Sequence, residues 1–140
     1  PALERGEIVL CDRFELSTRA YQGYGRGVPQ ETIVRLTAEA TDGILPDLYL
    51  LLDVPPSVGR GRQGCAAPDR IEREGMDFME RVRAGYAALA ASDPSVEAVD
   101  ASGAPDRVEA EIAAIVERRF PGLLRDSSGE TFAGGPGLRH

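Results

Sequence analysis

The sequence predicts an α/β fold in which a parallel sheet is flanked by helices. Short, continuous apolar runs alternate along the chain with longer segments whose apolar residues recur at helical spacing. Continuous apolar runs are typical of strands buried on both faces, and their alternation with helices is typical of parallel sheets. The length of 140 residues fits one domain.

Three apolar runs are predicted to be strands, and each is followed by an aspartate. The runs cover residues 8–11, 48–52 and 96–99, and the aspartates are Asp12, Asp53 and Asp100. Parallel strands end at the same edge of a sheet, where open α/β sheets bind their ligands. An aspartate can also simply end a strand or cap the next element, so the pattern leaves a structural role open.

Three segments show the spacing of amphipathic helices, namely residues 30–42, 76–91 and 105–119. Gly43 follows the first segment as a natural helix stop, and Pro105 occupies the position expected of a first helical residue. Residues 121–140 are rich in glycine, proline and serine and poor in large apolar residues. This composition predicts a flexible tail.

The composition excludes several kinds of chemistry for these residues. The formal net charge is −7, and all 16 basic residues are arginine. An acidic chain is a poor non-specific binder of nucleic acid, and without lysine there is no Schiff base or phosphoaspartate receiver. The only histidine is His140, which argues against a histidine-based triad or metal site.

Two cysteines, Cys11 and Cys65, are too few for a disulfide framework, and free thiols suit a reducing cytoplasm. No apolar run reaches the length that a membrane-spanning helix needs. The sequence therefore predicts a cytoplasmic protein that binds neither nucleic acid nor membrane.

Asp12 and Arg13 leave the first predicted strand together. A carboxylate at this edge can hold Mg²⁺ directly or through water. A guanidinium stays charged and binds phosphate oxygens in a bidentate manner. The pair predicts a site for a metal-bound phosphate, although an ion pair confined to a loop would use the same residues.

A second arginine-rich zone spans residues 60–83. Arg60 and Arg62 lie in its glycine- and alanine-rich part, from residue 59 to 68. Mobile loops with arginine close over negative charge during phosphoryl transfer, but a purely solvated role for both residues stays open. The arginines expected to be solvated positions of the following helix are Arg73, Arg81 and Arg83.

The segment from Val9 to Gly23, Val-Leu-Cys-Asp-Arg-Phe-Glu-Leu-Ser-Thr-Arg-Ala-Tyr-Gln-Gly, resembles the signature of bacterial thymidylate kinases. Further similar motifs follow in one register over residues 1–120: Pro46-Asp47-Leu48, Leu52-Asp53-Val54, Arg60-Gly61-Arg62, Asp69-Arg70-Ile71-Glu72 and Val99-Asp100-Ala101-Ser102. The resemblance implies a P-loop nucleoside monophosphate kinase-like parallel sheet flanked by helices, with a lid at about residues 59–72. It also implies transfer of the γ-phosphoryl group of ATP to dTMP with Mg²⁺, giving dTDP, in a homodimer.

The resemblance assigns roles to residues of four groups. It places Asp12 near the Mg²⁺ and the phosphates, and Arg13 between the acceptor and donor phosphates. It places Ser17, Thr18 and Gln22 at the thymine end, and Tyr21 beside the 2′ carbon of the sugar. It places Arg60 and Arg62 in the lid as transition-state arginines, and the loop Ala101-Ser102-Gly103 near the adenine.

One family element is missing from the 140 residues, the Gly-x-x-x-x-Gly-Lys-[Ser/Thr] loop that cradles the donor phosphates. The chain is therefore expected to be the C-terminal portion of a thymidylate kinase-like domain. It should have an incomplete sheet with an exposed apolar edge, and little or no activity alone. Two alternatives stay open: a non-catalytic remnant that binds a nucleotide or a partner, and a nucleoside monophosphate kinase for another base.

Overall fold

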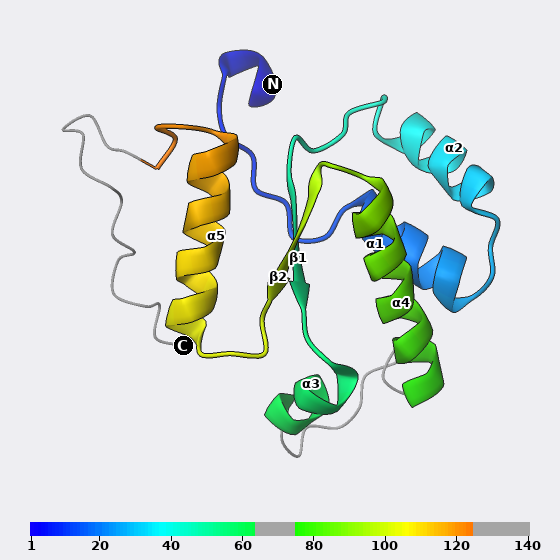
Figure 1. Cartoon of the computed structure of the whole chain (residues 1–140). Coiled ribbons are helices and arrows are strands. Elements are labelled where there is room, and N and C mark those ends of the chain that lie inside the picture. The colour runs from blue at the N-terminus through cyan, green and yellow to red at the C-terminus, as the bar shows by residue number, and fades with distance from the viewer. Residues whose placement is uncertain (64–74, 125–140) are drawn as a thin grey trace.

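Helices pack on both faces of a short parallel sheet (Figure 1). The computed structural model describes residues 1–63 and 75–124, and of residues 60–63 the backbone alone. Strands β1 (Tyr49–Asp53) and β2 (Val96–Asp100) pair in parallel, with Tyr49 opposite Val96 and Asp53 opposite Asp100. The helices are η1 (Leu3–Arg5), α1 (Glu15–Thr18), the π-helix η2 (Arg19–Gly25), α2 (Gln30–Ala40), α3 (Pro56–Gln63), α4 (Met76–Ser92) and α5 (Pro105–Arg119).

The predicted helices and the second and third predicted strands are confirmed with small shifts at their ends. The bounds of α5 match the prediction, and Pro105 is its first residue. Helix α2 ends at Ala40, and Gly43 adopts a φ of 73°, the left-handed conformation that glycine favours. The aspartates expected after two strands, Asp53 and Asp100, are the last residues of β1 and β2.

The first predicted strand, residues 8–11, is wrong, since this segment is extended but belongs to no sheet. A strand needs hydrogen-bonded neighbours, and among the residues described no other segment pairs with it. Helices α1 and η2 were not expected, and α3 extends over residues 59–63, the start of the segment from 59 to 68 where the composition had suggested a mobile loop. Local composition did not distinguish these helical turns from loops.

The core lies between α4, the α1–η2 segment and one face of the sheet. Its buried residues are Leu16, Ala20, Phe78, Val82, Leu89 and Val96. Two glycines allow η2 and α4 to approach closely. A Cβ on Gly25 would lie 2.6 Å from Cε2 of Phe78, and a Cβ on Gly85 would lie 2.5 Å from Cβ of Tyr24. The sequence of η2 is therefore fitted to the surface of α4.

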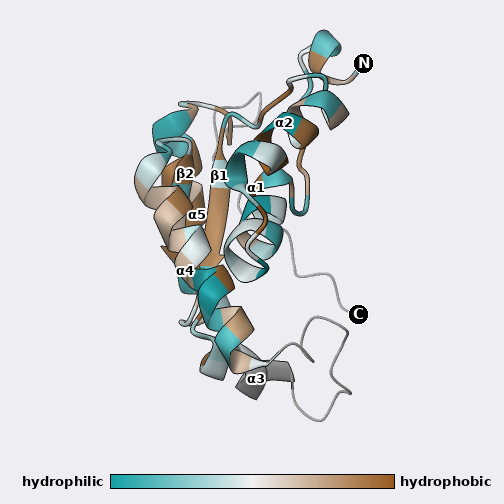
Figure 2. Ribbon diagram, turned by 90° about the vertical axis from the view of Figure 1, so that its right-hand side faces the viewer, coloured by the Kyte–Doolittle hydropathy of each residue, from teal (hydrophilic) through white to brown (hydrophobic). Residues whose placement is uncertain are grey.

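Helix α5 covers the other face of the sheet only in part. Val99 of β2 and Ile115 of α5 are buried, with exposed fractions of 0% and 5%. On the same face, Leu52 of β1 is 51% exposed. In the 8–11 segment, which lies outside the sheet, Leu10 is 93% exposed. Figure 2 shows β1 as a hydrophobic strand. Within the described part of the chain, the β1 side of the sheet thus exposes apolar side chains.

No helix among residues 1–63 and 75–124 combines the length and the apolar character needed to cross a membrane.

Replacing Gly85 by alanine should lower the free energy of unfolding by about 1 kcal/mol or more. The added methyl group would collide with Cβ of Tyr24, and overpacking of this kind costs about 1–3 kcal/mol. That cost outweighs the gain of about 1 kcal/mol at most that alanine brings to a helix. Urea denaturation of the wild type and the variant measures the difference.

The matched control is Gly59→Ala in α3, where an added Cβ meets no atom of the described residues within 4 Å. This variant should be as stable as the wild type or slightly more stable. Equal stability of Gly85→Ala and the wild type would show that η2 and α4 are not in close contact.

Candidate active site

The two residues predicted to bind a metal-bound phosphate, Asp12 and Arg13, lie just before the α1–η2 segment. This segment carries the residues predicted to bind the acceptor nucleotide. Asp12 and Arg13 are exposed and precede α1 directly. Arg13 has a φ of 63°, an uncommon backbone conformation for a residue with a side chain, and such conformations cluster at functional sites. Its guanidinium carbon lies 5.4 Å from the centre of the Tyr21 ring, within cation–π distance.

Tyr21, Ser17 and α4 form one connected cluster. The Tyr21 ring packs edge-on against Phe78 and Tyr86, with centroids 6.1 and 6.3 Å apart. The Tyr86 hydroxyl donates a hydrogen bond to Oγ of Ser17 at 2.8 Å. Burial raises the pKa of Tyr86 above its ordinary value, so its phenol stays protonated near neutral pH. Ser17 and Tyr21, two of the residues predicted to bind the acceptor nucleotide, are therefore both held by contacts with α4.

The other two residues predicted to bind the acceptor nucleotide, Thr18 and Gln22, lie on the same α1–η2 segment. Thr18 is the exposed last residue of α1. Gln22 lies one turn further, in the π-helix, and its Oε1 accepts a hydrogen bond from Nη1 of Arg26 at 3.0 Å. Residues four apart lie on one side of a helix, so Thr18 and Gln22 are neighbours. π-Helical turns are rare and are frequent at functional sites.

The aspartates that end β1 and β2 are both engaged by neighbouring groups. Asp53 accepts two hydrogen bonds of 2.8 Å from Nε and Nη2 of Arg83, and this pairing lowers the pKa of Asp53. Asp100 accepts hydrogen bonds from the backbone and the hydroxyl of Ser102, which lower its pKa. Within the described part of the chain, no three cysteine, histidine, aspartate or glutamate side chains gather as a metal site.

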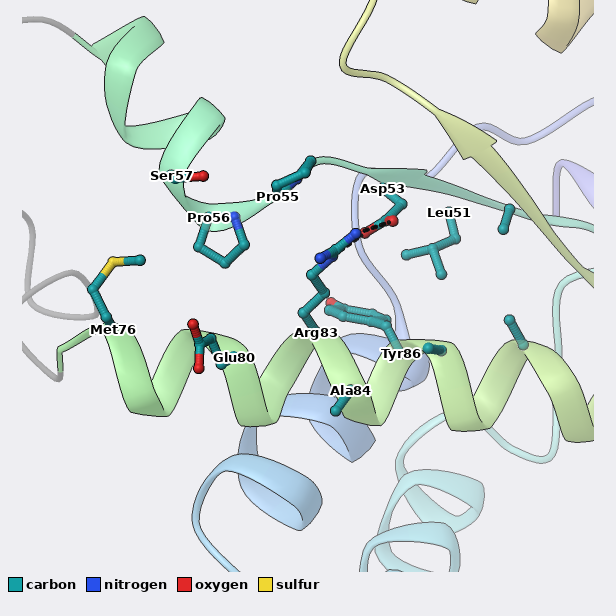
Figure 3. Close-up of a pocket in the computed structure, with 13 residues that line it drawn as sticks. Leu51, Asp53, Pro55, Pro56, Ser57, Met76, Glu80, Arg83, Ala84 and Tyr86 are labelled. Carbon is teal, nitrogen blue, oxygen red and sulfur yellow. Dashed lines mark hydrogen bonds and ion pairs between the residues drawn. The ribbon is translucent and has the colours of Figure 1, made fainter.

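A cavity of about 600 Å³ opens at the end of β1, between α3 and α4 (Figure 3). Its polar lining residues are Asp53, Ser57, Glu80 and Arg83, and the Tyr86 ring forms part of its wall. In Figure 3 the Arg83 side chain reaches from α4 to the Asp53 carboxylate. The cavity therefore combines an apolar wall with one strong charge pair.

Sequence reasoning missed the role of Arg83, which it expected to be a solvated helix residue. The partner of Arg83 is 30 residues away in sequence, so the i, i+4 spacing of the helix could not reveal it. Arg81, also expected to be solvated, likewise has a partner far away in sequence, because its Nε donates to the carbonyl oxygen of Gly25 at 3.3 Å. The available signal for this pair in the sequence was an aspartate at the end of a strand together with a helix rich in arginine.

A second cavity of about 610 Å³ adjoins the loop predicted to lie near the adenine. Ala101 and Gly103 line it, together with residues of the first two turns of α5. Ala101 is buried, and its backbone N–H donates to the carbonyl oxygen of Asp53 at 3.0 Å. Ser102 instead caps the end of β2 through Asp100. The loop is thus fixed to both strands beside an open hollow.

The predicted lid arginines cannot be placed relative to these groups. Arg60 and Arg62 belong to α3, but their side chains lie outside the described part of the structure. The Asp69-Arg70 motif lies in residues 64–74, which are also outside it.

Removing the guanidinium by Arg83→Gln should raise the pKa of the Asp53 carboxyl toward its ordinary value, because the Arg83 hydrogen bonds are the main cause of its depression. NMR titration of the Asp53 carboxyl carbon measures this pKa. A carboxyl with a depressed folded pKa stabilises the protein above its unfolded pKa and loses that effect as the pH falls through the folded pKa. Both side chains are about two-fifths exposed, 40% and 44%, so the stabilisation should be at most about 1 kcal/mol above about pH 5.

Arg81→Gln is the matched control, since Arg81 lies on the same helix and bonds to Gly25. It should leave the Asp53 titration unchanged. An unaltered Asp53 pKa in Arg83→Gln would contradict the pairing.

Comparison with known proteins gives one consistent relationship. The family model described as thymidylate kinase matches residues 1–112. A thymidylate kinase of Synechococcus sp. is 48% identical over 122 residues, which are 86% of this chain and 58% of that protein. Thymidylate kinases of Desulfovibrio desulfuricans and Desulforudis audaxviator are 47% and 44% identical, covering 88% and 99% of this chain and 63% and 60% of those proteins.

The chain spans about three-fifths of the length of these relatives. Its matched residues include the Asp12-Arg13 turn, the α1–η2 segment, β1, α4 and β2. The elements that assemble the candidate site are therefore those on which the similarity rests, and the chain belongs to the thymidylate kinase family.

Proposed function

We propose that the protein containing this chain transfers the γ-phosphoryl group of ATP to dTMP. In this reaction a 5′-phosphate oxygen of dTMP bonds to the γ-phosphorus, and the bond from that phosphorus to its bridging oxygen breaks, giving dTDP and ADP. The observation that carries the proposal is a cluster of three residues: Arg13, at the turn before α1, lies over the Tyr21 ring, and Tyr21 and Ser17 of the α1–η2 segment are held against α4. The family to which the chain belongs supports it.

Arg13 is proposed to bind the acceptor and donor phosphates. The residue is exposed at the turn before α1, and its side chain stays cationic at any pH at which the enzyme works. Phosphoryl transfer depends on positioning and on stabilising spreading negative charge, and a guanidinium does both. Arg60 and Arg62 of α3 are proposed to add positive charge from the lid.

The acceptor nucleoside is proposed to lie along the α1–η2 segment. Ser17, Thr18 and Gln22 offer hydroxyl and amide groups for the thymine end. Tyr21, wedged between Phe78 and Tyr86, is proposed to pack beside the 2′ carbon and to leave little room for a ribose hydroxyl. The Ala101-Ser102-Gly103 loop, beside its own cavity, is proposed to lie near the adenine of ATP.

Asp12 is the carboxylate proposed to hold Mg²⁺. Mg²⁺ commonly takes one or two carboxylates, with waters and phosphate oxygens as its other ligands, so a single aspartate fits this ion. Asp53 and Asp100 are engaged by Arg83 and Ser102, which leaves Asp12 as the exposed carboxylate beside the phosphate-binding arginine. When bound, the metal would neutralise charge on the ATP phosphates.

The 140 residues alone are proposed to catalyse the transfer slowly or not at all, because they contain no lysine for the donor phosphates. We also propose a cytoplasmic homodimer, with the exposed apolar side chains of Val34 and Leu36 on α2 as contact surface.

Coupled-enzyme assay of ADP release by the protein from the complete reading frame, with dTMP as acceptor, tests the proposed kinase activity. Binding of dTMP without turnover would favour the non-catalytic alternative.

Arg13→Ala should lower kcat for dTMP phosphorylation by about 100-fold or more, the usual loss when one charge-stabilising donor is removed. Steady-state assay with saturating ATP and dTMP measures it. Arg5→Ala is the matched control, because Arg5 pairs with Glu7 on the exposed N-terminal turn. Normal turnover of Arg13→Ala would exclude the phosphate role.

Tyr21→Ala should raise the ratio of kcat/KM for the ribonucleotide to kcat/KM for dTMP, because space opens beside the 2′ carbon. The ratio is the useful quantity, since losing the ring contacts with Phe78 and Tyr86 should weaken both reactions. Tyr21→Phe keeps the ring and should keep the ratio. If Tyr21→Ala left the ratio unchanged, the aromatic ring would not exclude ribose.

A further inference from the structure

The guanidinium of Arg13 lies over an aromatic ring. Its central carbon is 5.4 Å from the centre of the Tyr21 ring. This contact differs from that of Arg83, which gives two N–H groups to the Asp53 carboxylate. The face of a neutral ring attracts a cation but does not neutralise it. The ring can therefore hold Arg13 in one place while the positive charge of Arg13 stays available to an anion.

Two aromatic residues of α4 fix the orientation of the Tyr21 ring. The rings of Phe78 and Tyr86 contact it edge-on, with angles of 61° and 82° between the planes. Phe78 belongs to the buried core, and Tyr86 packs against that core. Because both neighbours are held by the core, the Tyr21 ring cannot turn its face away from Arg13 without losing close-packed contacts.

The backbone before α1 keeps Arg13 close to this ring. Arg13 has a φ of 63°, in the left-handed region, and its carbonyl oxygen accepts a hydrogen bond from Sγ of Cys11 at 3.3 Å. Phe14 then has an extended backbone, and α1 begins at Glu15. A strained backbone conformation persists only where surrounding contacts hold it, and the contact between Arg13 and Tyr21 is one of these.

We propose that Tyr21 is a positioning residue for phosphoryl transfer, whose ring face holds the Arg13 guanidinium where it meets the phosphates. The inference rests on the proposed function, in which Arg13 binds the acceptor and donor phosphates. Without the ring, the exposed Arg13 side chain would sample many rotamers, and ordering it at each binding event would weaken the reaction. Tyr21 thus acts on the phosphates through Arg13, in addition to its proposed place beside the 2′ carbon.

Fluorinated phenylalanines at position 21 test the proposal. Fluorine withdraws electrons from the ring face and changes the ring shape little, so it weakens a cation–π contact. In the protein from the complete reading frame, kcat/KM for dTMP should fall stepwise from Tyr21→Phe to the fully fluorinated ring. The total fall should be about twofold to fivefold, the size of an exposed cation–π contact. The same series at Tyr24, another tyrosine of η2, should leave kcat/KM unchanged.

The Arg13→Ala background provides the control, because fluorine at position 21 also changes the ring contacts with Phe78 and Tyr86. In this background the fluorine series should leave kcat/KM unchanged, since the cation is absent. A fall of equal size with and without Arg13 would overturn the proposal, because the effect would then belong to the contacts between the rings. A constant kcat/KM across the series in the presence of Arg13 would overturn it as well.

A measurement on the free protein keeps the proposal testable if the fluorinated variants do not fold. Nitrogen NMR relaxation should give the Nε–H group of Arg13 a higher order parameter than that of Arg35, an exposed arginine of α2. Tyr21→Leu should lower the Arg13 value to that of Arg35. An Arg13 side chain as mobile as Arg35 in the unsubstituted protein would overturn the proposal.

Failure of the proposed function gives a different result. In that case the wild-type protein has an ordered Arg13 side chain but neither phosphorylates dTMP nor binds it in calorimetry, and the inference falls with the function. A wild-type protein that phosphorylates dTMP, with a fluorine series of constant kcat/KM, would overturn the inference alone.

Discussion

The contact between α4 and the α1–η2 segment is the interaction on which the candidate site depends. Helices of four and seven residues, such as α1 and η2, are not stable alone in water, so tertiary packing must hold them. Here the packing comes from Phe78, Val82 and the small surface at Gly85. Because Ser17 and Tyr21 belong to these short helices, the packing of α4 against the helices determines where these two side chains lie.

The aspartates at the end of the sheet, Asp53 and Asp100, are both engaged by neighbouring side chains. β1 and β2 bring Asp53 and Asp100 into register, and two adjacent carboxylates would repel each other or attract a cation. Instead, Arg83 neutralises the first, and Ser102 with Arg107 engages the second. Two of the three aspartates predicted to follow strands are thus engaged by neighbouring side chains, and Asp12 is the one proposed to hold the metal.

The parts of the fold with local signals were predictable from the sequence. The helix from Pro105 to Arg119 has a proline start and a regular apolar face, and both of its ends were predicted correctly. The 8–11 segment has the residues of a strand, but pairing is not a local property, and the prediction was wrong there. The π-helix gives no regular apolar period, and the Arg83–Asp53 pair spans 30 residues, so neither could be read from spacing.

Sequence pattern and position disagree most clearly on the β1 side of the sheet. The residues of β1 form the continuous apolar run of a central strand, yet within the described part of the chain its one hydrogen-bonded neighbour is β2. Leu52 and Leu10 are therefore exposed to water, and an open strand edge is prone to pair with other chains. The measured stability of the chain therefore includes this exposure and any self-association that relieves it.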